Sequence, residues 1–174
     1  MQHLFGSIQR STETSTIVMR RTIKTSPHDA WDAIVNPERC ARWLGVVTGD
    51  LQPGGKYRIT FDDSDPTALV EGDVLRCVPG SELVVTWQAP GEEPSKVTAV
   101  LVPIGDSTEL LLTHSDLRAP ASDAGHAAGW QVHLDQLAAG LETDDWSDRW
   151  SEWGDLERAY TTVASVDGRV RWSV

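Results

Sequence analysis

The side chains best suited to acid–base chemistry in this sequence are the histidines of its second half. An imidazole changes charge near neutral pH, so it can transfer protons or orient the polar end of a ligand. His114 follows Leu110 and Leu112 by strict alternation, which predicts that it points to the apolar face of a sheet. His133 lies in the apolar stripe of a predicted helix. For each we weigh an acid or base beside a ligand against a buried histidine whose hydrogen bonds are satisfied in the core.

Metal and thiol chemistry find little support. His126 and His133 are seven residues apart on nearly one helix face, but zinc ligands usually come in tight pairs and the sequence offers no second pair. Cys40 and Cys77 have no histidine close in sequence, which favours reduced, small buried side chains. The sequence also lacks a P-loop, a dinucleotide fingerprint and a nucleophile elbow. We therefore expect no metal and no cofactor.

Length and charge narrow the class of protein further. The chain has 174 residues, which fits one soluble globular domain. Its net charge of -11 and pI of about 4.7 disfavour nucleic acid as a partner. No apolar run reaches the roughly 18 residues of a membrane span, and the first residues do not follow the order of a signal peptide. We therefore expect a cytoplasmic protein without membrane contact.

The elements that must position these side chains can be read from caps and periodicity. Residues 1–14 are polar and are expected to form a disordered arm. Ser26 and Pro27 form an N-cap and first turn typical of a helix, and a second short helix follows over residues 38–44. Alternating apolar residues predict strands at 16–24, 56–61, 69–78, 82–88, 96–102 and 108–114. A long amphipathic helix is predicted over 122–141.

The segment after this helix is acidic and rich in tryptophan. Residues 142–160 hold seven acids and two bases, yet Trp146, Trp150, Trp153 and Tyr160 recur at helical spacing. This pattern predicts an acidic helix with an aromatic stripe, interrupted at Gly154. Because four exposed rings would aggregate, the stripe must cover the domain itself or a second copy in a homodimer. Residues 165–174 carry an Asp-Gly turn and are expected to form a small hairpin.

The order of these elements and five segments in register resemble a known superfamily. The segments are SPHDAWDAIVNPERCARWLG, LQPGGKYRITF, VEGDVLRCVPGSELVVTW, TELLLTHSDL and GWQVHLDQLAAGL, which lie within residues 26–141. The chain is similar to SRPBCC or START-like proteins, and within them to the domain of the activator of the heat-shock-protein-90 ATPase. The resemblance implies an α+β helix-grip fold: a curved antiparallel sheet of six to seven strands wrapped around a long C-terminal helix, with two short helices after the first strand. The domain would span 15–141, with 142–174 as an extension.

The resemblance also implies a cavity between the sheet and the long helix that holds a small hydrophobic or aromatic molecule. Its lining would comprise Trp43, Tyr57, Phe61, Val85, Trp87, Leu112, His114, Trp130, His133 and Leu137. The leading hypothesis is accordingly a module that binds such a molecule. Two alternatives stay open: a cyclase-like or hydrolase-like enzyme using His114 or His133 as acid or base, and a protein-interaction or stress-response adaptor, similar to a co-chaperone, that uses the acidic aromatic segment.

Overall fold

The computed structural model of this protein describes residues 4–118 and 121–166. Its strands are β1 (Gly6–Arg10), β2 (Ser15–Ile23), β3 (Val46–Gly49), β4 (Lys56–Thr60), β5 (Leu69–Val78), β6 (Glu82–Trp87), β7 (Ser95–Ile104) and β8 (Ser107–Leu117). Its helices are α1 (Pro27–Val35), α2 (Pro37–Cys40), α3 (Asp123–Thr143) and α4 (Trp153–Val166), with a short 3-10 helix η1 (Trp150–Glu152) before α4. None of the described helices is long and apolar enough to cross a membrane.

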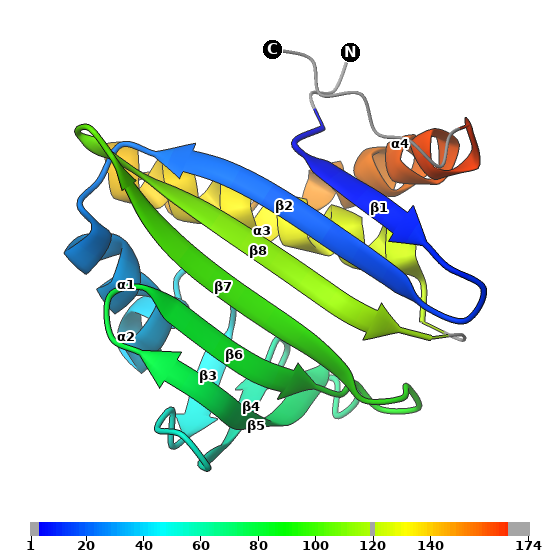
Figure 1. The fold of residues 1–174 in the computed structure, drawn as a ribbon, viewed down its shortest axis with the longest axis horizontal. Helices are drawn as coiled ribbons and strands as arrows, with labels where there is room; N and C mark the ends of the chain where they lie inside the picture. The colour runs from blue at the N-terminus through cyan, green and yellow to red at the C-terminus, as the bar shows by residue number, and fades with distance from the viewer. Residues whose placement is uncertain (1–3, 119–120, 167–174) are drawn as a thin grey trace.

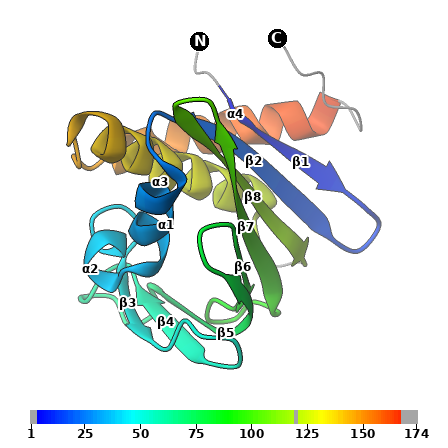
Figure 2. The same cartoon turned by 60° about the vertical axis from the view of Figure 1, so that its left-hand side comes forward.

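The strands form one antiparallel sheet in the order β1-β2-β8-β7-β6-β5-β4-β3. Figure 1 shows α3 running behind β2 and β8, with α1 and α2 at one end of the sheet and α4 beyond β1. Seen from the side in Figure 2, the sheet bends so that β3 to β5 face the helices. The α+β helix-grip fold expected from the sequence is therefore confirmed, with eight strands in the described residues where six to seven were expected.

The two additional strands are β1 and β3, and β1 corrects the expectation of a disordered arm over residues 1–14. Gly6 packs so closely on β2 that a Cβ there would lie 2.1 Å from the Met19 sulfur. The Arg10 guanidinium binds both carboxylate oxygens of Asp123 at 2.7 Å. β1 escaped detection because its residues are mostly polar, whereas backbone pairing with β2 and this ion pair hold it in place.

The helix start predicted at Ser26 is confirmed. The Ser26 hydroxyl accepts a hydrogen bond from the Asp29 backbone N–H, and Pro27 occupies the first turn. Asn36 caps α2 in the same way, by accepting from the Glu38 N–H. α2 ends at Cys40 in a series of turns, so it is shorter than the helix expected over 38–44.

α3 closes the concave side of the sheet and packs against β1, β2 and α4. Ser122 caps it by accepting from the Gly125 N–H. The apolar stripe read from the sequence is buried, with Trp130, Leu134 and Leu137 each at most 5% exposed. β8 also turns alternate side chains inward, from Thr108 through Leu110 and Leu112 to His114. The inward direction of His114 is thus confirmed.

The segment after α3 differs from the single interrupted helix that was expected. Asp144 adopts a left-handed φ of 60° and ends α3, so the chain leaves helical geometry over residues 145–149. Gly154 lies inside α4 and does not interrupt it. α4 packs on α3 and β1, with Leu156 and Tyr160 each 1% exposed. In the hairpin expected over 165–174, residues 167–174 lie outside the described residues, and the two before them end α4.

Candidate functional site

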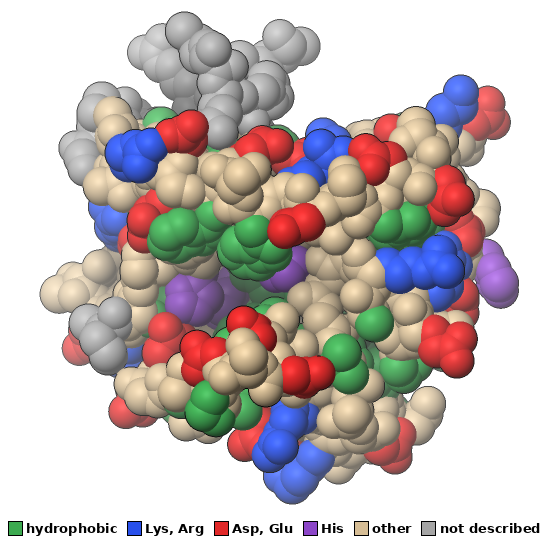
Figure 3. Space-filling model, turned by 180° about the vertical axis from the view of Figure 1, so that it is seen from behind, with side chains coloured by type: hydrophobic (Ala, Val, Ile, Leu, Met, Phe, Trp, Pro, Cys, Tyr) green, Lys and Arg blue, Asp and Glu red, His purple; other side chains and the backbone are tan. Residues whose placement is uncertain are grey.

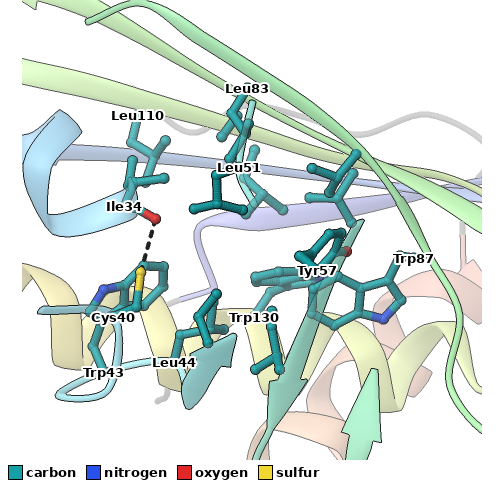
Figure 4. A pocket seen from close by; sticks show the side chains of 16 residues that line it. Ile34, Cys40, Trp43, Leu44, Leu51, Tyr57, Leu83, Trp87, Leu110 and Trp130 are labelled. Carbon is teal, nitrogen blue, oxygen red and sulfur yellow. Dashed lines mark hydrogen bonds between the residues drawn. The ribbon is translucent and has the colours of Figure 1, made fainter. Parts of the chain in front are cut away.

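The interior between the sheet and α3 contains a small enclosed cavity. Its volume is about 70 Å³, and Figure 4 shows the side chains around it. Every lining side chain is apolar or aromatic, with Cys40 the sole thiol: Ile34, Cys40, Trp43, Leu44, Val47, Leu51, Tyr57, Ile59, Leu83, Val85, Trp87, Val97, Ala99, Leu110, Leu112 and Trp130. A space of this volume holds a few water molecules at most, so this cavity alone is too small for an aromatic ligand.

A second and larger hollow lies on the other side of Trp87 and Trp130. This groove has a volume of about 490 Å³ and runs between the residue after β4, the start of β5, the loop after β6, α3, η1 and the start of α4. It is lined by Phe61, Thr67, Ala68, Leu69, Val70, Trp87, Ala89, Glu92, Ser122, Gly125, His126, Gly129, Trp130, His133, Trp150, Trp153 and Glu157. Figure 3 shows histidine surface at the bottom of this hollow, between hydrophobic side chains on one side and acidic side chains on the other.

Trp87 and Trp130 form the wall between the two spaces, since both line both of them. Their ring centroids are 5.0 Å apart. The Trp130 indole N–H donates to His114 Nδ1 at 3.0 Å, and His114 Nε2 lies 2.8 Å from the Ser95 hydroxyl oxygen. That hydroxyl donates to the Trp87 carbonyl at 3.0 Å. The chain of hydrogen bonds therefore joins the two tryptophans through His114 and Ser95.

His114 is a structural member of this wall. Because Nδ1 accepts from Trp130 and the Ser95 proton goes to Trp87, the imidazole must be neutral with its proton on Nε2. Burial, and to a lesser extent the nearby His126, lower the pKa of His114 to about 3. The side chain is 0% exposed and lines neither the cavity nor the groove. Both nitrogens are engaged within the protein, so a ligand has no access to them.

His133 has a different environment. Its Nδ1 lies 2.6 Å from the Trp43 carbonyl, which can only accept, so Nδ1 carries the proton and Nε2 keeps a lone pair. Burial lowers the pKa of His133 to about 4, although the hydrogen bond to Trp43 opposes this shift. The side chain is 7% exposed and lines the groove. Within residues 4–118 and 121–166, Nε2 has no hydrogen-bond partner, so a neutral acceptor remains in the wall of the groove.

The lining residues expected from the resemblance divide among these spaces. The cavity takes Trp43, Tyr57, Val85 and Leu112, and the groove takes Phe61 and His133. Trp87 and Trp130 line both, whereas His114 and Leu137 line neither. Leu137 is 0% exposed and belongs to the core. The structure therefore brings eight of the ten expected side chains to two adjoining spaces separated by a tryptophan wall.

Sequence reasoning did not place the C-terminal segment in the site. Trp150 approaches His133 edge to face, with ring centroids 5.1 Å apart. The Trp153 indole N–H donates to the Gly125 carbonyl at 3.3 Å. Below these rings, a Cβ on Gly129 would lie 3.9 Å from Trp150, so the helix surface there is open. The signal in the sequence was the aromatic stripe itself, which needed an apolar surface to cover.

The thiols and potential metal ligands add no further chemistry. The Cys40 thiol donates to the Ile34 carbonyl at 2.9 Å, the dashed line in Figure 4. Burial raises the pKa of Cys40 to about 12, so the reactive thiolate is disfavoured. Among the described residues no three metal-ligating side chains come together.

The curved antiparallel sheet closed by one long helix, with hollows between the two, defines a helix-grip protein of the SRPBCC superfamily. Residues 24–142 match the family described as "Activator of Hsp90 ATPase homolog 1-like protein". This match covers more than half of the chain, and the chain belongs to that family. No curated protein matches the sequence.

Solved structures of similar proteins share the fold. CalU16 from Micromonospora echinospora has a TM-score of 0.73 and 23% sequence identity, over 92% of this chain and 96% of that one. EF2215 of Enterococcus faecalis, a conserved protein of unknown function, has a TM-score of 0.75 and 18% identity, over 92% and 90% of the two chains. The protein encoded by BPP1335 of Bordetella parapertussis has a TM-score of 0.68 and 25% identity, over 91% and 92%.

Proposed function

We propose that this protein binds a small hydrophobic or aromatic molecule in the groove between the sheet and α3. Ligand sites are concave and mostly apolar, contain a few fixed polar groups, and typically enclose about 300–1,000 Å³. The groove has a volume of about 490 Å³ and is lined by five aromatic side chains: Phe61, Trp87, Trp130, Trp150 and Trp153. Its size and composition both fit a ligand that contains a fused aromatic ring.

The observation that carries this proposal is the free Nε2 of His133. Among the described residues, the buried side-chain atoms that lack a hydrogen-bond partner do not include Nε2, so this acceptor is open to the groove and within reach of a ligand. His133 is held in one tautomer by Trp43 and is surrounded by the rings of Trp43, Phe61, Trp130 and Trp150. A ligand with an N–H or O–H group on an aromatic ring supplies the missing donor while its ring packs on these side chains.

The other two hypotheses have less support. General acid–base catalysis needs a proton-transferring group within reach of the ligand, and His114 is enclosed by Ser95 and Trp130. Neither His114 nor His133 has a carboxylate partner among the described residues that would raise its basicity. The aromatic segment proposed for an adaptor is used within the chain, where Trp153 and Tyr160 pack on the domain.

The groove can be tested by filling it. We suggest measuring the binding of tryptophol, a neutral indole alcohol, and a thermal-shift screen with a library of small aromatic compounds. Gly129→Leu places a side chain in the groove, whereas Gly129→Ala adds only a Cβ for which there is room. We expect the alanine variant to keep binding and the leucine variant to lose at least about tenfold in affinity. An unchanged affinity in a folded leucine variant, or no stabilising compound in the library, would contradict the proposed site.

A further inference from the structure

The charges around the groove narrow the class of ligand. We infer that the groove binds an aromatic molecule that carries a protonated amino group, with the ring over His133 and the amino group near the start of α3. This inference rests on the proposed function, because it specifies what the same groove binds.

Acidic side chains gather at one end of the groove. Glu92 lies in the loop after β6, and its carboxylate is 3.4 Å from His126 Nε2. Glu157 lies on α4, and its carboxylate would be 3.3 Å from a Cβ on Gly125. Both carboxylates therefore lie next to the first turn of α3, and neither is fully exposed. Lys and Arg are absent from the described residues that line the groove.

Only one of these two carboxylates has a basic neighbour. His126 offsets Glu92 only when it is protonated, and its Nδ1 is already bonded to the Ser122 carbonyl at 2.9 Å. The ion pairs formed within the described parts of the chain do not include Glu157. The end of the groove at Gly125 therefore keeps at least one uncompensated negative charge.

The N-terminus of α3 at this end would by itself attract an anion, but side chains of the protein already provide the acceptor and the negative charge there. The Ser122 hydroxyl accepts from the Gly125 N–H, and the Asp123 carboxylate in the first turn of α3 is paired with Arg10 outside the groove. Glu157 places a carboxylate in the groove above the same turn. An anionic ligand would be repelled by this carboxylate, whereas a cation would be attracted by it.

The other end of the groove is aromatic. Trp150, Trp130 and Phe61 have ring centroids 5.1–6.2 Å from that of His133. Residues 125 and 133 are eight apart on α3, about 12 Å along the helix axis. This distance accommodates an indole-sized ring with a two-carbon arm that ends in an ammonium group. The ring N–H of such a ligand can donate to His133 Nε2, and Trp153, whose indole N–H bonds to the Gly125 carbonyl, lines the groove near the amino group.

Three indole compounds that differ in the charge of their side chain test this inference. The full chain is titrated at pH 7 and low salt with three indole compounds: tryptamine, tryptophol and indole-3-propionate. Their side chains are positively charged, neutral and negatively charged. Binding is measured from the NMR signals of the protein's tryptophan indole N–H groups. We expect tryptamine to bind about tenfold more tightly than indole-3-propionate, with tryptophol between them. Added salt should reduce this difference, because screening weakens exposed charge interactions.

Charge-neutralising variants locate the effect. Glu92→Gln and Glu157→Gln should each weaken tryptamine binding about threefold while leaving tryptophol binding unchanged. Glu93→Gln is the matched control, because Glu93 is exposed on the same loop, does not line the groove, and changes the net charge by the same amount. Equal affinities for the three compounds, tighter binding of indole-3-propionate, or an equal effect of the Glu93 variant would overturn the inference. If tryptophol binds and the other two compounds bind with the same affinity, the inference fails and the proposed function stands. If none of the three compounds binds, the inference fails and the library screen decides the proposed function.

Discussion

Two glycines on α3, eleven residues apart, meet the same C-terminal segment in opposite ways. At Gly140, a Cβ would lie 2.3 Å from the Trp146 ring, so the ring packs directly on the helix backbone. At Gly129, the nearest atoms are those of Trp150 and Trp153 at 3.9 and 4.0 Å, and the groove opens beside them. The C-terminal segment therefore seals one end of α3 and builds the wall of a hollow at the other.

The difference teaches that aromatic rings on one segment need not serve one purpose. Trp146 is held by its N–H to the Asp144 carboxylate and by the Arg42 guanidinium over its ring, so it fills space. Trp150 is 44% exposed although it is a large apolar side chain beside a buried histidine. An exposed ring of this kind, adjoining a hollow, is what a ligand would cover.

Acid should have the largest effect, and it should act on the open end, where both buried histidines lie. Folding lowers the pKa values of His114 and His133 from about 6.5 to about 3 and 4, so the unfolded chain binds more protons in that range. The stabilisation is complete above pH 6.5 and is lost as the pH falls toward 4. We expect the free energy of unfolding to decrease by up to about 1.4 kcal/mol per pH unit for each histidine.

Urea denaturation between pH 7 and 4.5 measures this slope. His133→Asn keeps an N–H that can donate to Trp43 but does not titrate, so it should flatten the curve. His28→Gln is the control, because His28 is exposed. A free energy of unfolding that stays constant across this range would show that neither histidine is buried in its neutral form.

Removing the anchor of α4 should have the next largest effect. Leu156 is 1% exposed where α4 packs on the domain, and Leu156→Ala should cost about 2–5 kcal/mol of unfolding free energy. Val163→Ala on the same helix is the control, since Val163 is 51% exposed, and it should change stability by no more than about 0.5 kcal/mol. Similar losses in both variants would mean that α4 does not dock through its buried face.

The sealed end can be tested with a single methyl group. Gly140→Ala forces the Trp146 ring away from α3 and should destabilise the protein by about 1–3 kcal/mol, measured by urea denaturation. The indole fluorescence should shift to longer wavelength if the ring moves into water. A neutral result would indicate that Trp146 does not rest on the helix in solution.

The open end should respond in the opposite direction and with the smallest effect. Gly129→Ala adds a methyl group where there is room, and alanine favours helix over glycine by up to about 1 kcal/mol. We therefore expect a modest rise in the melting temperature. A loss of stability comparable to that of the Gly140 variant would remove the contrast between the two ends.

Local rules predicted much of the fold. Ser26 and Pro27 gave the start of α1, and alternation along β8 placed His114 inside. β1 was missed because its polar residues carry no periodic signal, and only pairing with β2 orders them. Residues 142–160 were expected to form one helix interrupted at Gly154, whereas Asp144 takes a left-handed conformation and helical geometry resumes only at Trp150.

The candidate site was predictable only in part. The resemblance supplied Trp87, Trp130 and His133, but it grouped His114 with them as a lining residue. His114 does not line either space because it forms hydrogen bonds with Ser95 and Trp130, which lie on separate elements. Periodicity shows that a side chain points inward and does not show which partner it meets there.

The sequence by itself determined the helix-grip fold, the inward direction of both histidines and the need for an aromatic segment to find an apolar surface. The tertiary structure decided that His114 braces a wall, that His133 keeps a free acceptor, and that Glu92 and Glu157 both lie beside the first turn of α3. The physical reason is the distance along the chain over which each interaction acts. Caps and alternation act over a few residues, whereas the groove is formed by side chains from residue 61 to residue 157 whose proximity exists only after folding.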